Sequence, residues 1–378
     1  MATLLAAPDK FRGTITAAQA AEAIAAAGSA RGWNVRQVPL SDGGEGFLDA
    51  LGGLGGTRRQ VEVEGPLGAP VTAEWLQVGN LAVIEMAQAS GLMLAGGARG
   101  NDAWSATTRG TGELIVAAAR QVEREPSSPD SLPSDGAGGR AEAQRDRPTV
   151  VVGLGGSATT DGGRGALDAI EEAGGLGEVE LIGACDVSVG FVEAARRFGP
   201  QKGADPDLVV KLEGRLEQVA EEYRRRYGVD VLTAPGAGAA GGFGGAVLAL
   251  RGSLRSGYTA VSELLAFPEE LAASRAVVTG EGSLDASSLM GKVVGSVLAD
   301  ASARNVPVLI IAGRADREAV EGAEAAGARV VSLSEEYGEE RALTDTAACV
   351  TRAVRDALSP SESPGRPFAE GRGRPAEG

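Results

Sequence analysis

The chain has 378 residues, of which 43% are hydrophobic, and it contains no histidine. This length suits a globular protein of two domains, while 51 acidic against 36 basic residues, a net charge of −15, argue against a broad nucleic-acid or anionic-membrane surface. Without histidine, a Ser-His-Asp triad, a His-ligated zinc site and a phosphohistidine relay are excluded, so proton transfer falls to Asp, Glu, Lys or Tyr.

The sequence shows no export or membrane signature. No stretch approaches ~18 uninterrupted apolar residues, and Asp9 and Lys10 interrupt the first apolar run, so no signal peptide is predicted and the cytoplasm is the expected location. Cys185 and Cys349 have neither metal-ligand nor disulfide spacing, and we expect both to be reduced.

The first 86 residues predict strands and helices in alternation and then a change of pattern. An apolar run over 3–7 predicts a strand, and Thr16 with Gln19 predicts a capping box before an Ala-rich helix that ends near residue 27. A second strand over 35–40 is expected before Ser-Asp-Gly-Gly-Glu-Gly. From 59 to 86, strand-like runs separated by turn residues indicate that an inserted, more antiparallel domain begins there.

Later segments alternate between helices and short apolar strands, which indicates a parallel sheet with helical crossovers. The stretches 125–148 and 359–378, rich in Pro, Gly and charge, are expected to be disordered because they cannot bury enough apolar surface. Helices are predicted over 113–123, 161–173, 208–227, 236–250, 287–304 and 344–358, and strands over 148–152, 179–184, 275–278, 306–312 and 329–333.

Glycine and acidic residues follow several of the predicted strands. In parallel α/β sheets ligands bind beyond the carboxyl ends of strands, so these loops are expected to converge on one cleft, although each alone could be a tight turn. The loops are Pro8-Asp9-Lys10, Asp42-Gly-Gly-Glu45, Gly153-Leu-Gly-Gly156, Cys185-Asp186 and Thr279-Gly-Glu-Gly-Ser-Leu-Asp285.

Two glycine-rich segments could present main-chain N–H groups to phosphates at a helix start. They are 153–157 and 236–241, and the second matches G-x-G-x-x-G with Glu263 downstream, which keeps a dinucleotide-binding interpretation open. Pro235 and a poor preceding strand weaken that interpretation, and helix packing through small residues is the alternative. Gly291-Lys292 is not part of a Walker motif, because position 293 is Val.

Phosphoryl transfer requires cations on the moving phosphoryl group, a base for the acceptor hydroxyl and usually Mg²⁺ on carboxylates. An Asp is the natural base in a chain without histidine, and each acid could instead be a helix cap or turn residue. The acids available are Asp42, Glu45, Asp186, Glu281 and Asp285, and the cations are Lys10, Lys202 and Lys292, three of only four lysines.

The order of these motifs resembles the type I glycerate kinases, a two-domain family unrelated to P-loop kinases. The matching stretches run collinearly from residue 7 to about residue 313. They are Ala7–Thr14, Asp42–Gly46, Gly65–Gly68, Ile84-Glu85, Ala89–Leu92, Gly110–Ile115, Gly153–Thr159, Asp161–Gly163, Ala184–Val187, Phe198–Ala204, Pro235–Gly242, Thr279–Gly282 and Gly291-Lys292.

The resemblance implies an α/β fold in which both chain ends form a Rossmann-like parallel-sheet domain and a second α/β domain with a mixed sheet is inserted. We place the first domain at 1–60 plus 270–358 and the second at 61–269. The resemblance also implies that the cleft takes ATP, Mg²⁺ and glycerate as small-molecule partners, with no nucleic acid or membrane partner. The product would be 2- or 3-phosphoglycerate, the former favoured, and a homodimer stays open.

Site roles follow from the motifs and the resemblance together. Asp186 or Asp42 is expected to be the base, and Lys10 and Lys202 to contact the substrate or the γ-phosphate. Substrate-binding residues would be Asp9, Glu45 and Gln201, nucleotide-binding residues Gly153, Gly155, Gly156, Ser157 and Lys292, and Mg²⁺ ligands Glu281 and Asp285.

Two alternatives remain open at this level. Ser283 and Ser287 stand where the family pattern usually has Arg and Gln, which would suit a nucleotide-binding regulatory protein that kept the scaffold without turnover. An NAD-dependent oxidoreductase is supported by Gly236–Gly241 alone.

Overall fold

The structure is a computed structural model, and it describes residues 2–44, 46–124, 147–186, 188–360 and 367–368. The chain forms two compact units. The first comprises Met1–Asp42, Asp49–Gly53 and Tyr258–Gly378, and the second comprises Gly43–Leu48 and Leu54–Gly257. The helix α2 (Phe47–Ala50) and the 3₁₀ turn η1 (Leu51–Leu54) span the division between them.

The first unit is built on a five-stranded sheet in the order β11-β10-β9-β1-β2, and all its strand pairs are parallel. Both ends of the chain contribute strands to this sheet. The strands are β1 (Thr3–Ala6), β2 (Asn34–Gln37), β9 (Ala276–Leu284), β10 (Val308–Ala315) and β11 (Arg329–Ser332).

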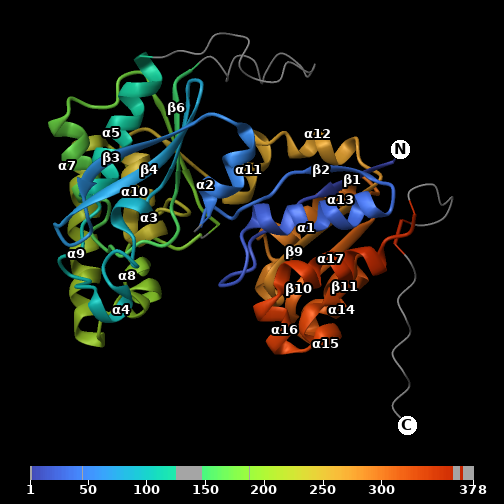
Figure 1. The fold of residues 1–378 in the computed structure, drawn as a ribbon. Coiled ribbons are helices and arrows are strands. Elements are labelled where there is room, and N and C mark those ends of the chain that lie inside the picture. The colour runs from blue at the N-terminus through green and yellow to red at the C-terminus, as the bar shows by residue number, and fades with distance from the viewer. Residues whose placement is uncertain (1, 45, 125–146, 187, 361–366, 369–378) are drawn as a thin grey trace. The chain divides into compact units, whose positions relative to one another are not determined.

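Helices connect these strands and cover the sheet. Leu4 and Ala6 of β1 share a buried cluster with Val278 of β9 and with apolar side chains of α1 and α17, two helices that pack against each other (Figure 1). The helices are α1 (Ala17–Ala30), α11 (Gly257–Leu264), α12 (Phe267–Ala272), the 3₁₀ turn η4 (Ala286–Leu289), α13 (Val293–Ala303), α14 (Arg317–Ala325), α15 (Leu333–Tyr337), α16 (Glu339–Thr344) and α17 (Thr346–Ala357).

The second unit is built on a six-stranded mixed sheet in the order β3-β4-β5-β6-β7-β8. The first two pairs are antiparallel and the other three are parallel. The strands are β3 (Thr57–Glu64), β4 (Pro70–Val78), β5 (Leu81–Glu85), β6 (Thr149–Gly153), β7 (Glu180–Ala184) and β8 (Ser253–Arg255). The expected α/β architecture, with one parallel and one mixed sheet, is confirmed.

Two apolar clusters stabilise the second unit. In one, α5 packs on the sheet through Leu114 and Ile115, and in the other α9 packs on α8 through Leu212 and Leu216. The helices are α3 (Ala87–Ser90), α4 (Gly97–Gly100), α5 (Arg109–Arg124), α7 (Arg164–Glu172), α8 (Glu193–Phe198), the 3₁₀ turn η3 (Pro200–Lys202), α9 (Pro206–Tyr227) and α10 (Ala239–Ala249).

Local predictions can be compared with these elements. The capping box of Thr16 and Gln19 is present at the start of α1. The helix predicted from residue 161 begins only at Arg164, because Gly162 and Gly163 both take left-handed φ angles of 73° and 80°.

Much of the two segments expected to be disordered, residues 125–146, 361–366 and 369–378, lies outside the described residues. Phe368 departs from that expectation, since it is 8% exposed and pairs with Leu358. Aromatic burial anchors this part of the tail.

Candidate active site

The first unit has a topological switch point between β1 and β9. From β1 the chain crosses through α1 to β2, whereas from β9 it crosses through α13 to β10 on the other side. Right-handed crossovers in opposite directions place these two helices on opposite faces of the sheet. Ligands of open α/β sheets bind beyond the carboxyl ends of the strands at such a point. Asp9 follows β1 there, and Glu281 lies near the end of β9.

Two hydrogen bonds hold Asp9 in place, one to β9 and one to the next residue in the chain. Its N–H donates to the Gly280 carbonyl at 2.9 Å, and its Oδ1 accepts the N–H of Lys10 at 2.7 Å. Burial raises the pKa of Asp9 to about 6, an effect that the Lys10 charge opposes and the Asp42 charge reinforces. Lys10 Nζ lies 3.8 Å from Asp42 Oδ1. The structure thus brings three predicted site residues together in this unit.

Glu281 carries a buried carboxyl oxygen that the protein leaves unsatisfied. Its Oε1 has no hydrogen-bond partner among the described residues, and the same holds for the buried Oγ1 of Thr279, two residues earlier on β9. Burial raises the pKa of Glu281 to about 7, and the charge of Asp9 adds to this. Because alternate residues of a strand share a face, both unsatisfied atoms lie on one side of β9.

The segment after β9 holds Lys292 through a serine. Asp285 Oδ1 accepts hydrogen bonds from Ser287 Oγ at 2.5 Å and from the Ser288 N–H at 3.1 Å, so Asp285 is the N-cap of η4. The Ser287 hydrogen bond holds the pKa of Asp285 below its usual value. Lys292 Nζ donates to Ser287 Oγ at 2.7 Å. Asp285 therefore has a structural role that Glu281 lacks.

In the second unit, glycine loops pack at the carboxyl ends of β6 and β7. A Cβ on Gly155 would lie 2.4 Å from the Cα of Gly44, and a Cβ on Gly43 would lie 2.7 Å from the carbonyl of Ala184. The N–H groups of Leu154 and Gly155 donate to the carbonyls of Ala184 and Gly43. These two N–H groups are thus committed to packing the loop.

The rest of the 153–157 loop does not lead into a helix as expected. Six residues, 158–163, separate Ser157 from the start of α7. Ser157 is buried, and its hydroxyl pairs with Thr159 Oγ1 at 2.9 Å. The helix dipole that the sequence suggested for this loop is therefore not adjacent to it, because the turn at 161–163 intervenes.

Asp186 and Gln201 are exposed residues of the second unit, and Glu45 lies outside the described residues. Asp186 follows β7, and its Oδ1 accepts the N–H of Gly257 at 2.9 Å. Gln201 lies in η3.

Lys202, next in the chain, is buried, with 6% of its surface exposed. Its Nζ donates to the Thr159 carbonyl at 2.5 Å, and its own carbonyl accepts from Asn101 Nδ2 at 2.8 Å. Burial lowers the pKa of Lys202 to about 7, and the charge of Asp161 opposes this. The ammonium thus lies inside the second unit, bonded to main chain.

The G-x-G-x-x-G segment has a packing role. Ala240, Gly241 and Gly242 all have positive φ, and a Cβ on Gly241 would lie 2.0 Å from the Thr159 carbonyl. Within the described residues no strand directly precedes α10. These features favour close backbone packing over the dinucleotide-binding interpretation.

Comparison with known proteins identifies the family. A sequence profile described as the glycerate kinase family matches residues 4–174 and 171–359. The chain belongs to the glycerate kinase family. It is 35% identical over 352 residues to the glycerate 2-kinase of Escherichia coli K12, covering 82% of this chain and 84% of that protein. It is 34% identical over 352 residues to the glycerate kinase of Bacillus subtilis 168, covering 83% and 86%.

A solved structure agrees with this assignment. The crystal structure of a candidate glycerate kinase 2 from Salmonella typhimurium LT2 matches with a TM-score of 0.73 and 29% identity, over 94% of this chain and 96% of that one. The resemblance drawn from the motifs, and the expectation of a glycerate kinase enzyme, are confirmed. In the described part of the chain, no helix has the length and apolar character needed to cross a membrane.

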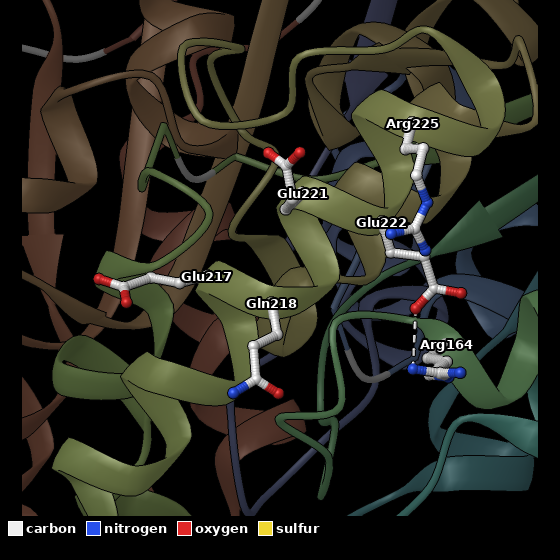
Figure 2. Close-up of a pocket in the computed structure, with 6 residues that line it drawn as sticks. All are labelled: Arg164, Glu217, Gln218, Glu221, Glu222 and Arg225. Carbon is white, nitrogen blue, oxygen red and sulfur yellow. Dashed lines mark ion pairs between the residues drawn. The ribbon is translucent and has the colours of Figure 1, made fainter.

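One surface hollow in the described part of the chain is separate from the predicted site of this glycerate kinase family member. It lies between α7 and α9 in the second unit, and Arg164 Nη1 pairs with Glu222 Oε2 across it at 2.8 Å (Figure 2). The other lining residues are Glu217, Gln218, Glu221 and Arg225. It contains none of the sequence-predicted site residues and is an open hollow between charged and amide side chains, so we assign it no ligand.

Sequence reasoning missed Thr279 and Arg314. Thr279 could have been found by its alternation with Glu281 along an apolar strand, since a hydroxyl at a buried position requires a partner. Arg314 had no local signal, because its significance depends on its pairing with Ser283, 31 residues away. No group of three Asp, Glu or Cys side chains in the described residues forms a metal cluster.

Proposed function

We propose that this chain transfers the γ-phosphoryl group of ATP to the C2 hydroxyl of D-glycerate, with Mg²⁺, and releases ADP and 2-phosphoglycerate. The observation that carries the proposal is the switch point of the first unit, where the partly buried carboxyls of Asp9 and Glu281 lie with the ammonium groups of Lys10 and Lys292. The carboxylates are suited to bind a metal ion, and the neighbouring ammonium groups are suited to bind the phosphate that accompanies it.

The residues present fit Mg²⁺, but with a pair of carboxylate ligands that differs from the pair predicted from the sequence. Mg²⁺ keeps several waters and typically takes one or two carboxylates together with substrate phosphates. Glu281 offers an unsatisfied Oε1, and Asp9 is electrostatically coupled to it. We therefore propose Glu281 and Asp9 as the ligands, and assign Asp285 to capping η4. The metal would neutralise charge that develops on the phosphoryl oxygens.

Lys10 and Lys292 are proposed to contact phosphate oxygens. A lysine ammonium acts as a compact point charge, which suits a phosphoryl group that moves during the reaction. Lys10 lies beside Asp9 and within 3.8 Å of Asp42, while Lys292 is oriented by Ser287. Each ammonium group is thus held in position before a ligand binds, which reduces the side-chain entropy lost on binding.

Asp42 or Asp186 is proposed as the base. The base takes the proton of the C2 hydroxyl, the hydroxyl oxygen bonds to the γ-phosphorus, and the bond to the β-phosphate bridging oxygen breaks as ADP leaves. Asp42 is held by Lys10, whereas Asp186 is exposed and held by the Gly257 N–H. Comparing Asp42→Asn with Asp186→Asn decides between them: the base variant loses kcat and retains ATP binding.

For Lys202, burial changes the proposed role. An ammonium bonded to the Thr159 carbonyl inside the second unit supports the segment after the 153–157 loop, so we propose Lys202 as a positioning residue. Gln201 beside it and Glu45 remain proposed substrate contacts. Gly153, Gly155, Gly156 and Ser157 remain proposed near the nucleotide, with the N–H groups of Gly156 and Ser157 as the candidates for a ligand.

An ADP-release assay with D-glycerate, ATP and Mg²⁺ tests the proposal. The name of the Escherichia coli relative, glycerate 2-kinase, supports 2-phosphoglycerate as product. Turnover that requires all three components is the expected result. No turnover at saturating concentrations, with ATP binding retained, would instead favour a regulatory protein on the same scaffold.

A further inference from the structure

Arg314 is an exposed arginine whose guanidinium is held in one orientation. It lies near the end of β10 directly opposite Ser283 of β9, and its Nε donates to Ser283 Oγ at 2.9 Å. In the described residues, no carboxylate forms an ion pair with it. Within the same described residues, no hydrogen bond or ion pair engages the two terminal nitrogens of the guanidinium, so both can donate to a ligand.

This guanidinium lies on the same face of the sheet as the unsatisfied atoms described above. Thr279, Glu281 and Ser283 alternate along β9, so their side chains share one face. Arg314 bonds to Ser283 from the neighbouring strand and therefore joins that face. Val278 and Ile311 point to the other face, into the cluster with α1 and α17. The face of Arg314 is therefore the one covered by α13.

One short segment positions two cations. Ser283 orients Arg314, Ser287 accepts from Lys292 Nζ at 2.7 Å, and Ser288 Oγ donates to the Ser283 carbonyl at 3.4 Å, which folds the segment 283–288 back on β9. Lys292 is also the N-cap of α13, an 11-residue helix without a side-chain hydrogen bond to its first N–H groups.

The charge of this arrangement identifies the class of ligand. Two unit cations and the positive end of α13 exceed what a single carboxylate would require, whereas a di- or triphosphate carries several negative charges over several oxygens. A guanidinium fork matches two oxygens of a phosphate. The buried Thr279 Oγ1, which has no protein partner, gives a further polar group on the same strand face.

We propose that Arg314, oriented by Ser283, is a phosphate-binding residue of the nucleotide site, which it forms with Lys292 and the N-terminus of α13. The inference rests on the proposed function for the identity of the ligand as a nucleotide. It assigns the polyphosphate of ATP and ADP to the end of β10, beyond the switch point itself.

Calorimetric titration with ADP and with inorganic tripolyphosphate tests this assignment without turnover. Arg314→Met is expected to weaken binding of both by about tenfold to a hundredfold, the effect of losing charge-assisted hydrogen bonds. Ser283→Ala should weaken it by a smaller factor in the same direction, and Arg314→Lys should fall between wild type and Arg314→Met. Arg317→Met is the matched control, because Arg317 is exposed on α14 and pairs with Glu321.

Three results would overturn the assignment. One is unchanged ADP and tripolyphosphate binding in a folded Arg314→Met protein. Another is a raised KM for glycerate with unchanged nucleotide binding, which would make the guanidinium a carboxylate contact. The third is an equal loss in Arg317→Met, which would mean a general surface-charge effect. If wild type binds ADP but does not phosphorylate glycerate, the proposed function fails while the titrations still test Arg314.

Discussion

Asp9, which follows β1, and Glu281 of the adjacent strand β9 are electrostatically coupled, and a main-chain hydrogen bond holds the two segments together. The Asp9 N–H donates to the carbonyl of Gly280, the residue before Glu281, at 2.9 Å. Each carboxyl has a raised pKa, with burial as the main cause, and the charge of Asp9 raises the pKa of Glu281 further. Such a pair is costly in the free protein and is a functional-site signal for that reason.

Replacing Glu281 by Gln should therefore stabilise the ligand-free protein while it abolishes activity. The amide carries no charge to desolvate, so we expect Tm to rise at pH 8, while kcat/KM falls by about a hundredfold or more. Thermal unfolding and initial rates measure the two effects. Glu335→Gln, on the exposed surface of α15, is the control and should change neither. A Glu281→Gln protein that is less stable and fully active would contradict the assigned role.

The pH dependence follows from the same two carboxyls. Their pKa values rise from 3.8 and 4.5 to about 6 and about 7 on folding, so the folded protein binds more protons than the unfolded one between these values. Stability without ligands should therefore fall as pH rises from about 4 to about 7 on their account. Mg²⁺ competes with these protons, so its apparent affinity should increase over pH 6–8. A magnesium affinity independent of pH would exclude these ligands.

Asp285 can be tested as a cap against its alternative role as a metal ligand. Asparagine is as good an N-cap as aspartate, but it lacks the charge that Mg²⁺ prefers. We expect Asp285→Asn to be close to wild type in KM for Mg²⁺, and Asp285→Ala to lose about 1 kcal/mol of stability and to weaken nucleotide binding through Ser287 and Lys292. Equal impairment of metal dependence in both variants would restore Asp285 as a ligand.

Lys202→Ala should lower the free energy of unfolding more than it lowers kcat. Removing the ammonium leaves the Thr159 carbonyl without its donor, a loss of about 1–3 kcal/mol in the free energy of unfolding. Because burial depresses the pKa of Lys202 from 10.5 to about 7, the wild-type contribution should become more favourable as pH rises from about 7 to about 10. Denaturant unfolding at pH 7 and pH 9 measures both. A large kcat loss with unchanged stability would return Lys202 to the reaction itself.

Two glycines give a matched test of the G-x-G-x-x-G segment. Gly241→Ala introduces a Cβ 2.0 Å from the Thr159 carbonyl at a φ of 69°, so we expect a loss of about 2–4 kcal/mol in unfolding free energy. Gly214→Ala, on α9 with open space around it, should instead gain about 0.5–1 kcal/mol. Tight NADH binding to wild type that Gly241→Ala abolishes while remaining folded would contradict the packing role.

The fold followed from local signals because those signals agree with the tertiary structure. The apolar run before Asp9 became β1, and Thr16 capped α1 as its spacing indicated. The acidic residues after strands were found for the same reason, since the switch point depends only on strand order. Glu281 could thus be proposed as a site residue from its motif.

Features that depend on distant partners could not be assigned from sequence. A lysine in a glycine-rich turn gives no indication that Asn101 and Thr159 enclose it. The contact of Ser283 with Arg314 depends on the register of β9 and β10, which places the two residues opposite each other. The sequence predicts Asp285 as a metal ligand, and the structure shows that it caps η4; acidic residues after strands have the same sequence signature in either role.

Phosphorus NMR of a reaction with D-glycerate, ATP and Mg²⁺ tests the central claim most directly. A phosphate on C2 couples to one proton and gives a doublet, whereas a phosphate on C3 couples to two and gives a triplet. The account predicts that wild type accumulates the doublet together with ADP, and that Glu281→Gln forms neither. A reaction in which no phosphate ester of glycerate appears, with the protein folded and ATP bound, would contradict it.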